Sequence, residues 1–177
     1  MNYIVSLNTK TNFHFEISAD LLNEAFFESV RSAPKGLFQF EIGVQSTNSD
    51  TLDEIQRKTD FEKLKKNVLE LLKIGNSHIH LDLIAGLPYE DFESFKNSFN
   101  DVHALMPHML QLGFLKLLKG SGLRNNAIRY GIEYNDFPPY EVIKTSSISY
   151  YELIKLKRLE DVLEIYYNSG RFDKTLK

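Results

Sequence analysis

The chain has 177 residues, 42% of them hydrophobic and 25% charged, which is an ordinary globular mixture and long enough for one domain with its own core. Its formal net charge of −3 argues against nucleic acid as a partner, because phosphate binding needs a concentrated basic surface. The absence of cysteine excludes disulfides, thiolate nucleophiles, zinc–cysteine sites and any iron–sulfur cluster held by this chain alone.

A strand, a helix and a second strand are predicted first. Residues 12–18 (NFHFEIS) alternate apolar with polar side chains, which is the period of a strand. Asp20 can cap a helix over residues 21–32, and a Pro-Lys-Gly turn then ends it. Residues 37–43 (LFQFEIG) alternate again and predict a second strand, from which a polar loop leads into a short helix around Leu52.

The middle of the chain repeats this order. Asp60 can cap a longer helix with apolar residues at three- and four-residue spacing, and Gly75 can end it. Residues 78–84 (HIHLDLI) predict a third strand, residues 92–102 a helix, and residues 109–115 a fourth strand. Strands joined by helices are usually parallel, because only a crossover returns the chain to the same end of the sheet. We therefore predict an α/β fold with about four parallel βα units.

The last third of the chain has a looser pattern. Lys119-Gly120-Ser121-Gly122 predicts a turn, for which a phosphate-binding loop is the weaker alternative. A final amphipathic helix is predicted over residues 150–168, across the outside or the end of the sheet. We expect residues 1–131 to form the sheet-bearing unit, and residues 132–177 to form an irregular segment and a C-terminal helix that packs on it.

One face of each predicted strand is polar. Strands in a parallel sheet that helices cover on both sides are usually apolar throughout. The polar side chains that would share one face here are His14, Glu16, Gln39, Glu41, His78, His80, Asp82 and Gln111. Because buried carboxylates need partners, we expect this face to surround water or a polar ligand. A sheet of antiparallel type with one solvated face is the alternative.

Two stretches carry a resemblance to a known family. Glu41-Ile42-Gly43-Val44-Gln45-Ser46, followed by Arg57, resembles the fourth strand and next helix of the radical S-adenosylmethionine (radical SAM) superfamily. Asp82-Leu83-Ile84-Ala85-Gly86-Leu87-Pro88 resembles the fifth strand and its loop. The likeness is greatest to coproporphyrinogen-oxidase-like members and to cobalamin-binding-domain members known as magnesium-protoporphyrin IX monomethyl ester cyclases. It covers about residues 12–123 and implies a partial TIM-like barrel, the second part of a six-unit one.

The resemblance also implies a cofactor site at the carboxyl ends of the strands. Glu16 would bind the methionyl amino group of S-adenosylmethionine, and Gln45 and Arg57 would bind its carboxylate, for which a guanidinium is a bidentate partner. Asp82 would face the ribose or adenosine, where a carboxylate can accept hydroxyl hydrogen bonds. Backbone near Ile84 would contact adenine. No catalytic residue is expected in this chain.

Each of these side chains has a purely structural alternative. Glu16 could be a satisfied carboxylate of the inner face, and Gln45 could cap a loop. Arg57 could be a surface residue paired with Asp53 or Glu54. Asp82 could support the turn at residues 86–88.

The family's chemistry needs a [4Fe–4S] cluster on three cysteines, which generates a 5′-deoxyadenosyl radical from S-adenosylmethionine. Because this chain has no cysteine, we expect those residues upstream in a longer parent oxidoreductase, and we expect the chain to be inactive alone. The partners implied are the missing N-terminal half of the barrel and a small-molecule substrate. The resemblance leaves open whether the parent also binds cobalamin.

Two other functions were weighed. His78 and His80 share one strand face with Asp82, and such a pair can bind zinc in a hydrolase, with His14 as a further ligand. A non-catalytic binding module is the other alternative, since exposed strand edges favour self-association. We expect no membrane partner, because no apolar run approaches the roughly 20 residues that span a bilayer. A cytoplasmic location is expected, because the start of the chain lacks a signal-peptide pattern.

Overall fold

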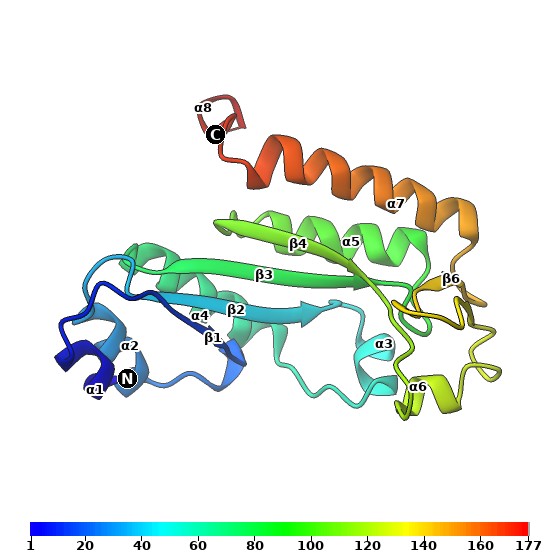
Figure 1. Ribbon diagram of the computed structural model, residues 1–177, viewed down its shortest axis with the longest axis horizontal. Helices are drawn as coiled ribbons and strands as arrows, with labels where there is room; N and C mark the ends of the chain where they lie inside the picture. Colours follow the sequence, from blue (N-terminus) through cyan, green and yellow to red (C-terminus); the bar gives the residue numbers. More distant parts are fainter. Residues whose placement is uncertain (177) are drawn as a thin grey trace.

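Four parallel strands form one sheet in the order of the sequence, as the computed structural model in Figure 1 shows for residues 1–176. They are β1 (Phe13–Glu16), β2 (Phe38–Gln45), β3 (His78–Ala85) and β4 (Met109–Phe114). Because every neighbouring pair is parallel, the carboxyl ends of all four strands lie along one edge of the sheet. This confirms the predicted α/β fold. The four strands curve as part of a barrel does, without closing one.

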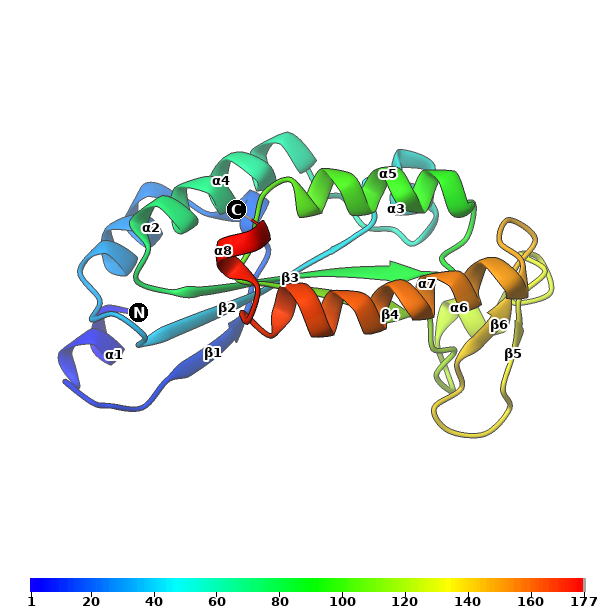
Figure 2. The same ribbon diagram turned by 90° about the horizontal axis from the view of Figure 1, so that it is seen from above.

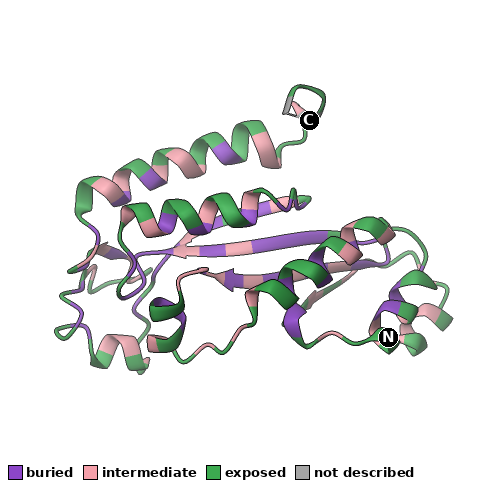
Figure 3. Cartoon of the chain, turned by 180° about the vertical axis from the view of Figure 1, so that it is seen from behind, coloured by how far each residue is buried: buried purple, intermediate pink, exposed green. Residues whose placement is uncertain are grey.

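Three helices cover one face of the sheet (Figure 2): α2 (Glu24–Arg31), α4 (Phe61–Ile74) and α5 (Phe92–His103). The largest fully buried strand side chains are Phe38, Phe40, Ile42, Ile79, Leu81, Leu83, Leu110 and Leu112. They form one core cluster with helix residues such as Leu64 and Phe95. Figure 3 shows long buried stretches along the sheet, and the buried strand residues come from β2, β3 and β4. Each such side chain contributes about 1.5–3 kcal/mol on burial, so this face holds the sheet and helices together.

The first predicted helix was wrong at its start. The structure has a 3-10 turn, η1 (Ala19–Leu21), and then α2, which begins at Glu24. Asn23 caps α2, because its side chain accepts the backbone N–H of Phe26 at 3.1 Å. Asp20 lies inside η1 and caps nothing. The extended backbone of Leu22 separates the two elements, so two residues that favour N-caps compete here and the second begins the helix.

The caps of the other core helices agree with the sequence. The Asp60 side chain accepts the N–H of Lys63 at the start of α4, and Gly75 ends that helix with a left-handed φ of 71°. Asp91 caps α5 in the same way, through the N–H of Ser94. Two shorter helices are α1 (Asn2–Ser6), before the sheet, and α3 (Ser49–Glu54), after β2.

The turn at residues 119–122 is structural. Ser121 Oγ accepts the N–H of Arg124 at 3.2 Å and so caps the short helix α6 (Gly122–Asn125). The segment after it contains an antiparallel pair, β5 (Glu133–Tyr134) and β6 (Val142–Lys144), which the sequence analysis did not predict. Strands of two and three residues are too short to show a period.

The C-terminal helix lies beside β4 in both views (Figures 1 and 2). It begins as α7 (Tyr150–Val162) with a capping box between Ser149 and Glu152, and continues as a π-helical segment, η2 (Leu163–Asn168). The extent predicted from the sequence is therefore confirmed, whereas the π-helical end was not foreseen. A last short helix, α8 (Asp173–Leu176), follows. No helix among residues 1–176 combines the length and the apolar character needed to cross a membrane.

The outer edge of β4 is covered by this C-terminal part. The Asn168 side chain accepts the N–H of Leu110 at 3.0 Å and donates to its carbonyl at 2.9 Å, as a neighbouring strand would. Beyond the other end of β4, Lys116 forms a β-bridge with Glu141. Since β1 pairs only with β2, the unpaired edge of the sheet within residues 1–176 is that of β1.

Asn168→Ala is expected to destabilise the chain by about 1–3 kcal/mol, because it leaves the buried N–H and carbonyl of Leu110 without partners. Urea unfolding followed by circular dichroism measures this loss. Asn100→Ala, at an exposed position of α5, is the matched control and should change stability little. Equal midpoints for the two variants would show that Asn168 does not seal the strand edge.

Candidate functional site

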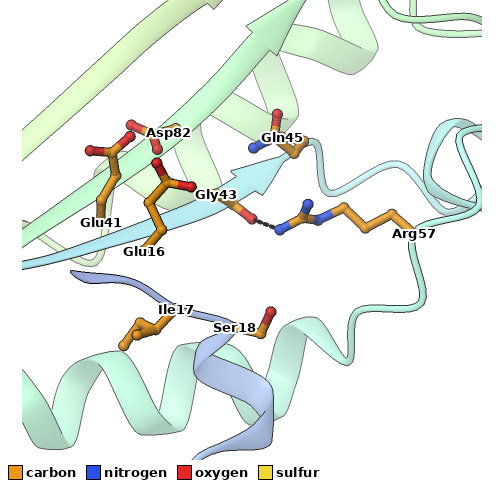
Figure 4. A pocket seen from close by; sticks show the side chains of 8 residues that line it. All are labelled: Glu16, Ile17, Ser18, Glu41, Gly43, Gln45, Arg57 and Asp82. Carbon is orange, nitrogen blue, oxygen red and sulfur yellow. Dashed lines mark hydrogen bonds between the residues drawn. The ribbon is translucent and has the colours of Figure 1, made fainter. Parts of the chain in front are cut away.

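A pocket of about 370 Å³ opens on the polar face of the sheet, at the carboxyl ends of β1, β2 and β3 (Figure 4). Its lining residues come from three strands, the segment after β1 and the segment after α3, and they are Glu16, Ile17, Ser18, Glu41, Gly43, Gln45, Arg57 and Asp82. Its volume is in the usual range for a small-molecule site.

The predicted polar face is confirmed, and its charges are close together. Glu16 pairs in register with Glu41, and Glu41 with His80. The carboxylates of Glu16 and Glu41 lie on neighbouring strands and repel each other. The imidazoles of His14 and His80 lie near Glu41 and offset its negative charge. Glu41 Oε2 lies 2.9 Å from His14 Nε2 and 3.8 Å from His80 Nδ1. Glu16 is exposed and forms no ion pair or hydrogen bond with any residue in 1–176, so it is free for a cationic group.

His80 joins the two acidic positions of the sheet. It is 5% exposed, and its Nε2 lies 3.0 Å from Asp82 Oδ1 without the alignment of a hydrogen bond. The Asp82 carboxylate raises the pKa of His80 above its ordinary 6.5, against the effect of burial, and Glu41 adds to the rise. The imidazolium form of His80 is therefore favoured beneath the pocket.

Gln45 and Arg57 meet above Gly43. Gln45 ends β2 with a φ of 70°, a left-handed backbone conformation that residues other than glycine rarely adopt. Its side chain folds back over Gly43, where an added Cβ would lie 2.3 Å from Gln45 Nε2 and 3.3 Å from Arg57 Nη2. Arg57 Nη2 donates a hydrogen bond to the Gly43 carbonyl (Figure 4). The glycine thus makes room for both polar side chains at the pocket rim.

Four of the five residues predicted from the sequence line this pocket: Glu16, Gln45, Arg57 and Asp82. Ile84 is partly buried and is not among its lining residues. The roles of all five in binding a ligand stay predictions.

The structural alternatives for these side chains are not realised. Arg57 pairs with neither Asp53 nor Glu54, since Glu54 instead contacts Arg129 at 3.3 Å and accepts the Tyr130 hydroxyl at 2.5 Å. Within residues 1–176, the Gln45 side chain caps no loop. Asp82 contacts His80 rather than the turn at residues 86–88.

Glu41 also belongs to the site, although its alternation in the sequence predicted only a place on the polar face. Glu41 alternates in the same register as Glu16, and this was the signal that could have identified it. Gly43 was also missed, because the close approach that requires it is made by Gln45 and Arg57 in three dimensions. His80 was weighed as a metal ligand, and it supports Asp82 and Glu41 instead.

The zinc alternative finds no geometry to support it. Among the residues that the structure describes, no group of three or more histidine, aspartate and glutamate side chains is placed to hold a metal ion. His78 stacks on His108 with ring centroids 5.2 Å apart, and burial lowers the pKa of His78.

The unpaired atoms around the pocket define the ligand that it suits. Within residues 1–176, Arg57 Nε is buried without a hydrogen-bond acceptor, whereas Asp82 Oδ1 is buried against His80 Nε2 at 3.0 Å. Buried polar groups normally have partners, so the Nε–H of Arg57 indicates a missing acceptor. With the free carboxylate of Glu16, the set suits a molecule that carries an ammonium group, a carboxylate and hydroxyl groups. S-adenosylmethionine has all three, so the residues present fit the cofactor implied by the resemblance.

Comparisons with known proteins agree with this fold. Residues 3–102 match the family model described as the radical SAM superfamily, and residues 128–177 match one described as a protein of unknown function (DUF4080). The oxygen-independent coproporphyrinogen-III oxidase-like protein HemZ of Bacillus subtilis (strain 168) is 29% identical over 94 residues, which are 53% of this chain and 19% of that protein.

Two solved structures share the fold. Coproporphyrinogen III oxidase (HemN) from Escherichia coli, a radical SAM enzyme, superposes with a TM-score of 0.60 at 18% identity, over 90% of this chain and 33% of that one. The radical S-adenosylmethionine methyltransferase TsrM from Kitasatospora setae, solved with cobalamin and a [4Fe–4S] cluster, has a TM-score of 0.58 at 13% identity, over 72% and 26%. The chain therefore spans about a fifth to a third of these relatives.

His80 is expected to titrate above its ordinary pKa of 6.5, and Asp82→Asn is expected to lower that midpoint. A histidine whose folded pKa is raised stabilises the fold below 6.5, and this stabilisation is lost as pH rises through the folded value. Heteronuclear NMR of the histidine ring signals measures the midpoint. Asp161→Asn on α7 is the control and should leave it unchanged. If Asp82→Asn also leaves it unchanged, the contact does not set the charge of His80.

Proposed function

Since this chain belongs to the radical SAM superfamily, we propose that its pocket binds S-adenosylmethionine and forms part of the active site of a larger Fe–S oxidoreductase. The observation that carries the proposal is the convergence of Glu16, Gln45, Arg57 and Asp82 at the carboxyl ends of parallel strands. Open α/β folds bind their ligands at this edge of the sheet.

Each side chain has a role that its chemistry suits. Glu16, which has no partner within residues 1–176, would accept hydrogen bonds from the methionyl ammonium group. Arg57 is held by the Gly43 carbonyl through Nη2, and its free Nε faces the methionyl carboxylate in this proposal. Gln45 would donate its amide to the same carboxylate. Asp82, supported by His80, would accept from the ribose hydroxyls.

The chain would contribute binding and orientation rather than the redox step. In this family the one-electron chemistry is supplied by S-adenosylmethionine together with a [4Fe–4S] cluster, and the protein orients both and excludes water. The chain has no cysteine to hold such a cluster. We therefore propose that the cluster ligands belong to another segment of the full-length protein.

The free edge of β1 is the proposed position of that segment. The C-terminal part covers the edge of β4, whereas the edge of β1 is left unpaired within residues 1–176. A further parallel strand added at β1 would extend the curved sheet on the side of Glu16 and place the cluster next to the pocket. The substrate, a cobalamin site in the full-length protein and the cytoplasmic location stay predictions.

In the full-length protein with its cluster, Arg57→Ala and Asp82→Ala are each expected to weaken S-adenosylmethionine binding by about 10- to 100-fold. Each change removes a charge-assisted hydrogen bond worth about 1.5–3 kcal/mol. Equilibrium dialysis measures the binding, and iron content with the electron paramagnetic resonance spectrum checks that the cluster is intact. Lys65→Ala, at an exposed position of α4, is the control. Unchanged binding in both variants would show that the cofactor lies elsewhere.

The 177-residue chain alone is expected to hold no [4Fe–4S] cluster and to release no 5′-deoxyadenosine from S-adenosylmethionine, because it has no thiolate ligands. Anaerobic incubation with iron, sulfide and dithionite, followed by iron analysis and chromatography of nucleoside products, tests both points. Iron-dependent cleavage by this polypeptide would contradict the division of roles proposed above.

A further inference from the structure

Behind the pocket, a glutamate is buried among hydroxyl groups. Glu90 is 1% exposed and lies in the loop between β3 and α5, two residues before α5 begins at Phe92. It is neither a predicted site residue nor part of the pocket lining. The binding roles proposed above do not use it. A carboxyl group this deep in a protein is costly to keep and normally has a specific reason to be there.

Glu90 connects two parts of the chain that are far apart in sequence. Its Oε1 accepts hydrogen bonds from Ser46 Oγ at 2.5 Å, after β2, and from Ser98 Oγ at 3.0 Å, on α5. The two hydroxyls in turn accept backbone N–H groups: Ser98 Oγ that of Thr47 at 3.0 Å, and Ser46 Oγ that of Asn48 at 2.9 Å. One carboxyl oxygen thus organises the three residues that follow Gln45.

The same three residues lead directly to both polar side chains of the pocket rim. Ser46 directly follows Gln45 in the chain. The left-handed backbone of Gln45 is unfavourable for a residue other than glycine, so the surrounding structure must hold it. Asn48 caps α3 by accepting the N–H groups of Asp50 and Thr51 at 2.9 and 3.3 Å. Arg57 then follows α3 and donates its N–H to the Leu52 carbonyl at 2.8 Å.

We propose that Glu90 is a positioning residue, which holds the segment 46–48 and α3 so that Gln45 and Arg57 face the pocket. The inference rests on the proposed function, in which Gln45 and Arg57 bind the carboxylate of S-adenosylmethionine. It extends the site to a second layer of residues that touches no ligand.

The protonation state of Glu90 governs how well this arrangement is held. Its Oε2 is buried without a hydrogen-bond partner in the described part of the chain. Burial raises the pKa of Glu90 from 4.5 to about 7, while the hydrogen bonds from Ser46 and Ser98 lower it and the neighbouring Asp91 carboxylate raises it. The carboxylate of Asp101, on α5, accepts a hydrogen bond from the Thr47 hydroxyl at 2.9 Å. No basic side chain among residues 1–176 lies within ion-pair distance of Glu90.

The sign of the pH effect follows from linkage. A carboxyl group whose pKa is raised in the closed arrangement favours that arrangement while it is protonated. Between pH 4.5, its ordinary value, and about 7, the closed arrangement loses stability relative to an open one in which Glu90 is hydrated. The rim of the pocket should therefore be best ordered at low pH, become looser as pH rises towards about 7, and change little above that value.

The test is an NMR pH titration of the labelled 177-residue chain, followed at the Gln45 amide and Arg57 Nε–H signals. In the wild type both signals should shift with a midpoint near 7, and in Glu90→Gln neither should titrate there. In Ser98→Ala the shared midpoint should rise, because a hydrogen bond that lowers the pKa of Glu90 is lost. A merely structural role would not move this midpoint. Glu62→Gln, exposed on α4, is the control.

A binding measurement on the full-length protein with its cluster separates this proposal from the proposed function. The probes are S-adenosylhomocysteine, which has the amino-acid end, and 5′-methylthioadenosine, which lacks it. From about pH 6 to about pH 8, the Kd for S-adenosylhomocysteine should rise by about three- to tenfold in the wild type and not in Glu90→Gln. The Kd for 5′-methylthioadenosine should not change in either.

Each outcome decides one of the two proposals. Gln45 and Arg57 signals that do not titrate near pH 7, or that titrate equally in Glu90→Gln, overturn the positioning role. Signals that follow Glu90 as expected, while neither probe binds the wild type, support the positioning role and overturn the proposed cofactor site instead. Equal weakening of both probes in Glu90→Gln would indicate general destabilisation and also overturn the positioning role.

Discussion

The parallel pairing of β1 with β2, β2 with β3 and β3 with β4 is the constraint on which the rest of this structure depends. Each strand must be followed by a crossover that returns the chain to the same end of the sheet. The crossover helices α2, α4 and α5 need an apolar surface, and the strands supply it with one side-chain set. The other set is then left free of helices. The same pairing brings the ends of all these strands to one edge, and the polar side chains there meet in one pocket.

The acidic side chains on the open face of the sheet destabilise the fold by repelling each other, and neighbouring histidines reduce this repulsion. Glu16 and Glu41 are register partners, so their repulsion acts against the pairing of β1 with β2. His14 and His80 offset the charge of Glu41, and His80 also offsets that of Asp82. Glu16 keeps no such partner within residues 1–176. Glu16 therefore remains available to a cationic group at the mouth of the pocket.

Two layers of polar residues meet behind the pocket. In the first, Gln45 and Arg57 lie over Gly43 at a strained end of β2. In the second, Glu90 and the hydroxyls of Ser46 and Ser98 join the next loop to α5. Strained backbone at a site persists only where the surroundings determine it, and the second layer is what surrounds Gln45. The C-terminal helix lies at the edge of the sheet farthest from β1, where the Asn168 side chain makes the hydrogen bonds that a further strand would make to β4.

The sequence by itself determined the class of fold, through strands that alternate with helices, and the polar face, because a period of two places alternate side chains on one face whatever the context. Four of the pocket residues, Glu16, Gln45, Arg57 and Asp82, followed from the resemblance of two sequence stretches to the radical SAM superfamily. It also determined that no cluster is held by this chain, since thiolate ligands are absent. Only the tertiary structure decided which capping residue begins α2, since Asp20 and Asn23 are equally suitable locally. It alone placed Glu41 and Gly43 in the site and Glu90 behind it. Their roles arise from contacts between residues as many as 44 positions apart, such as Ser46 and Glu90, and chain order carries no record of such contacts.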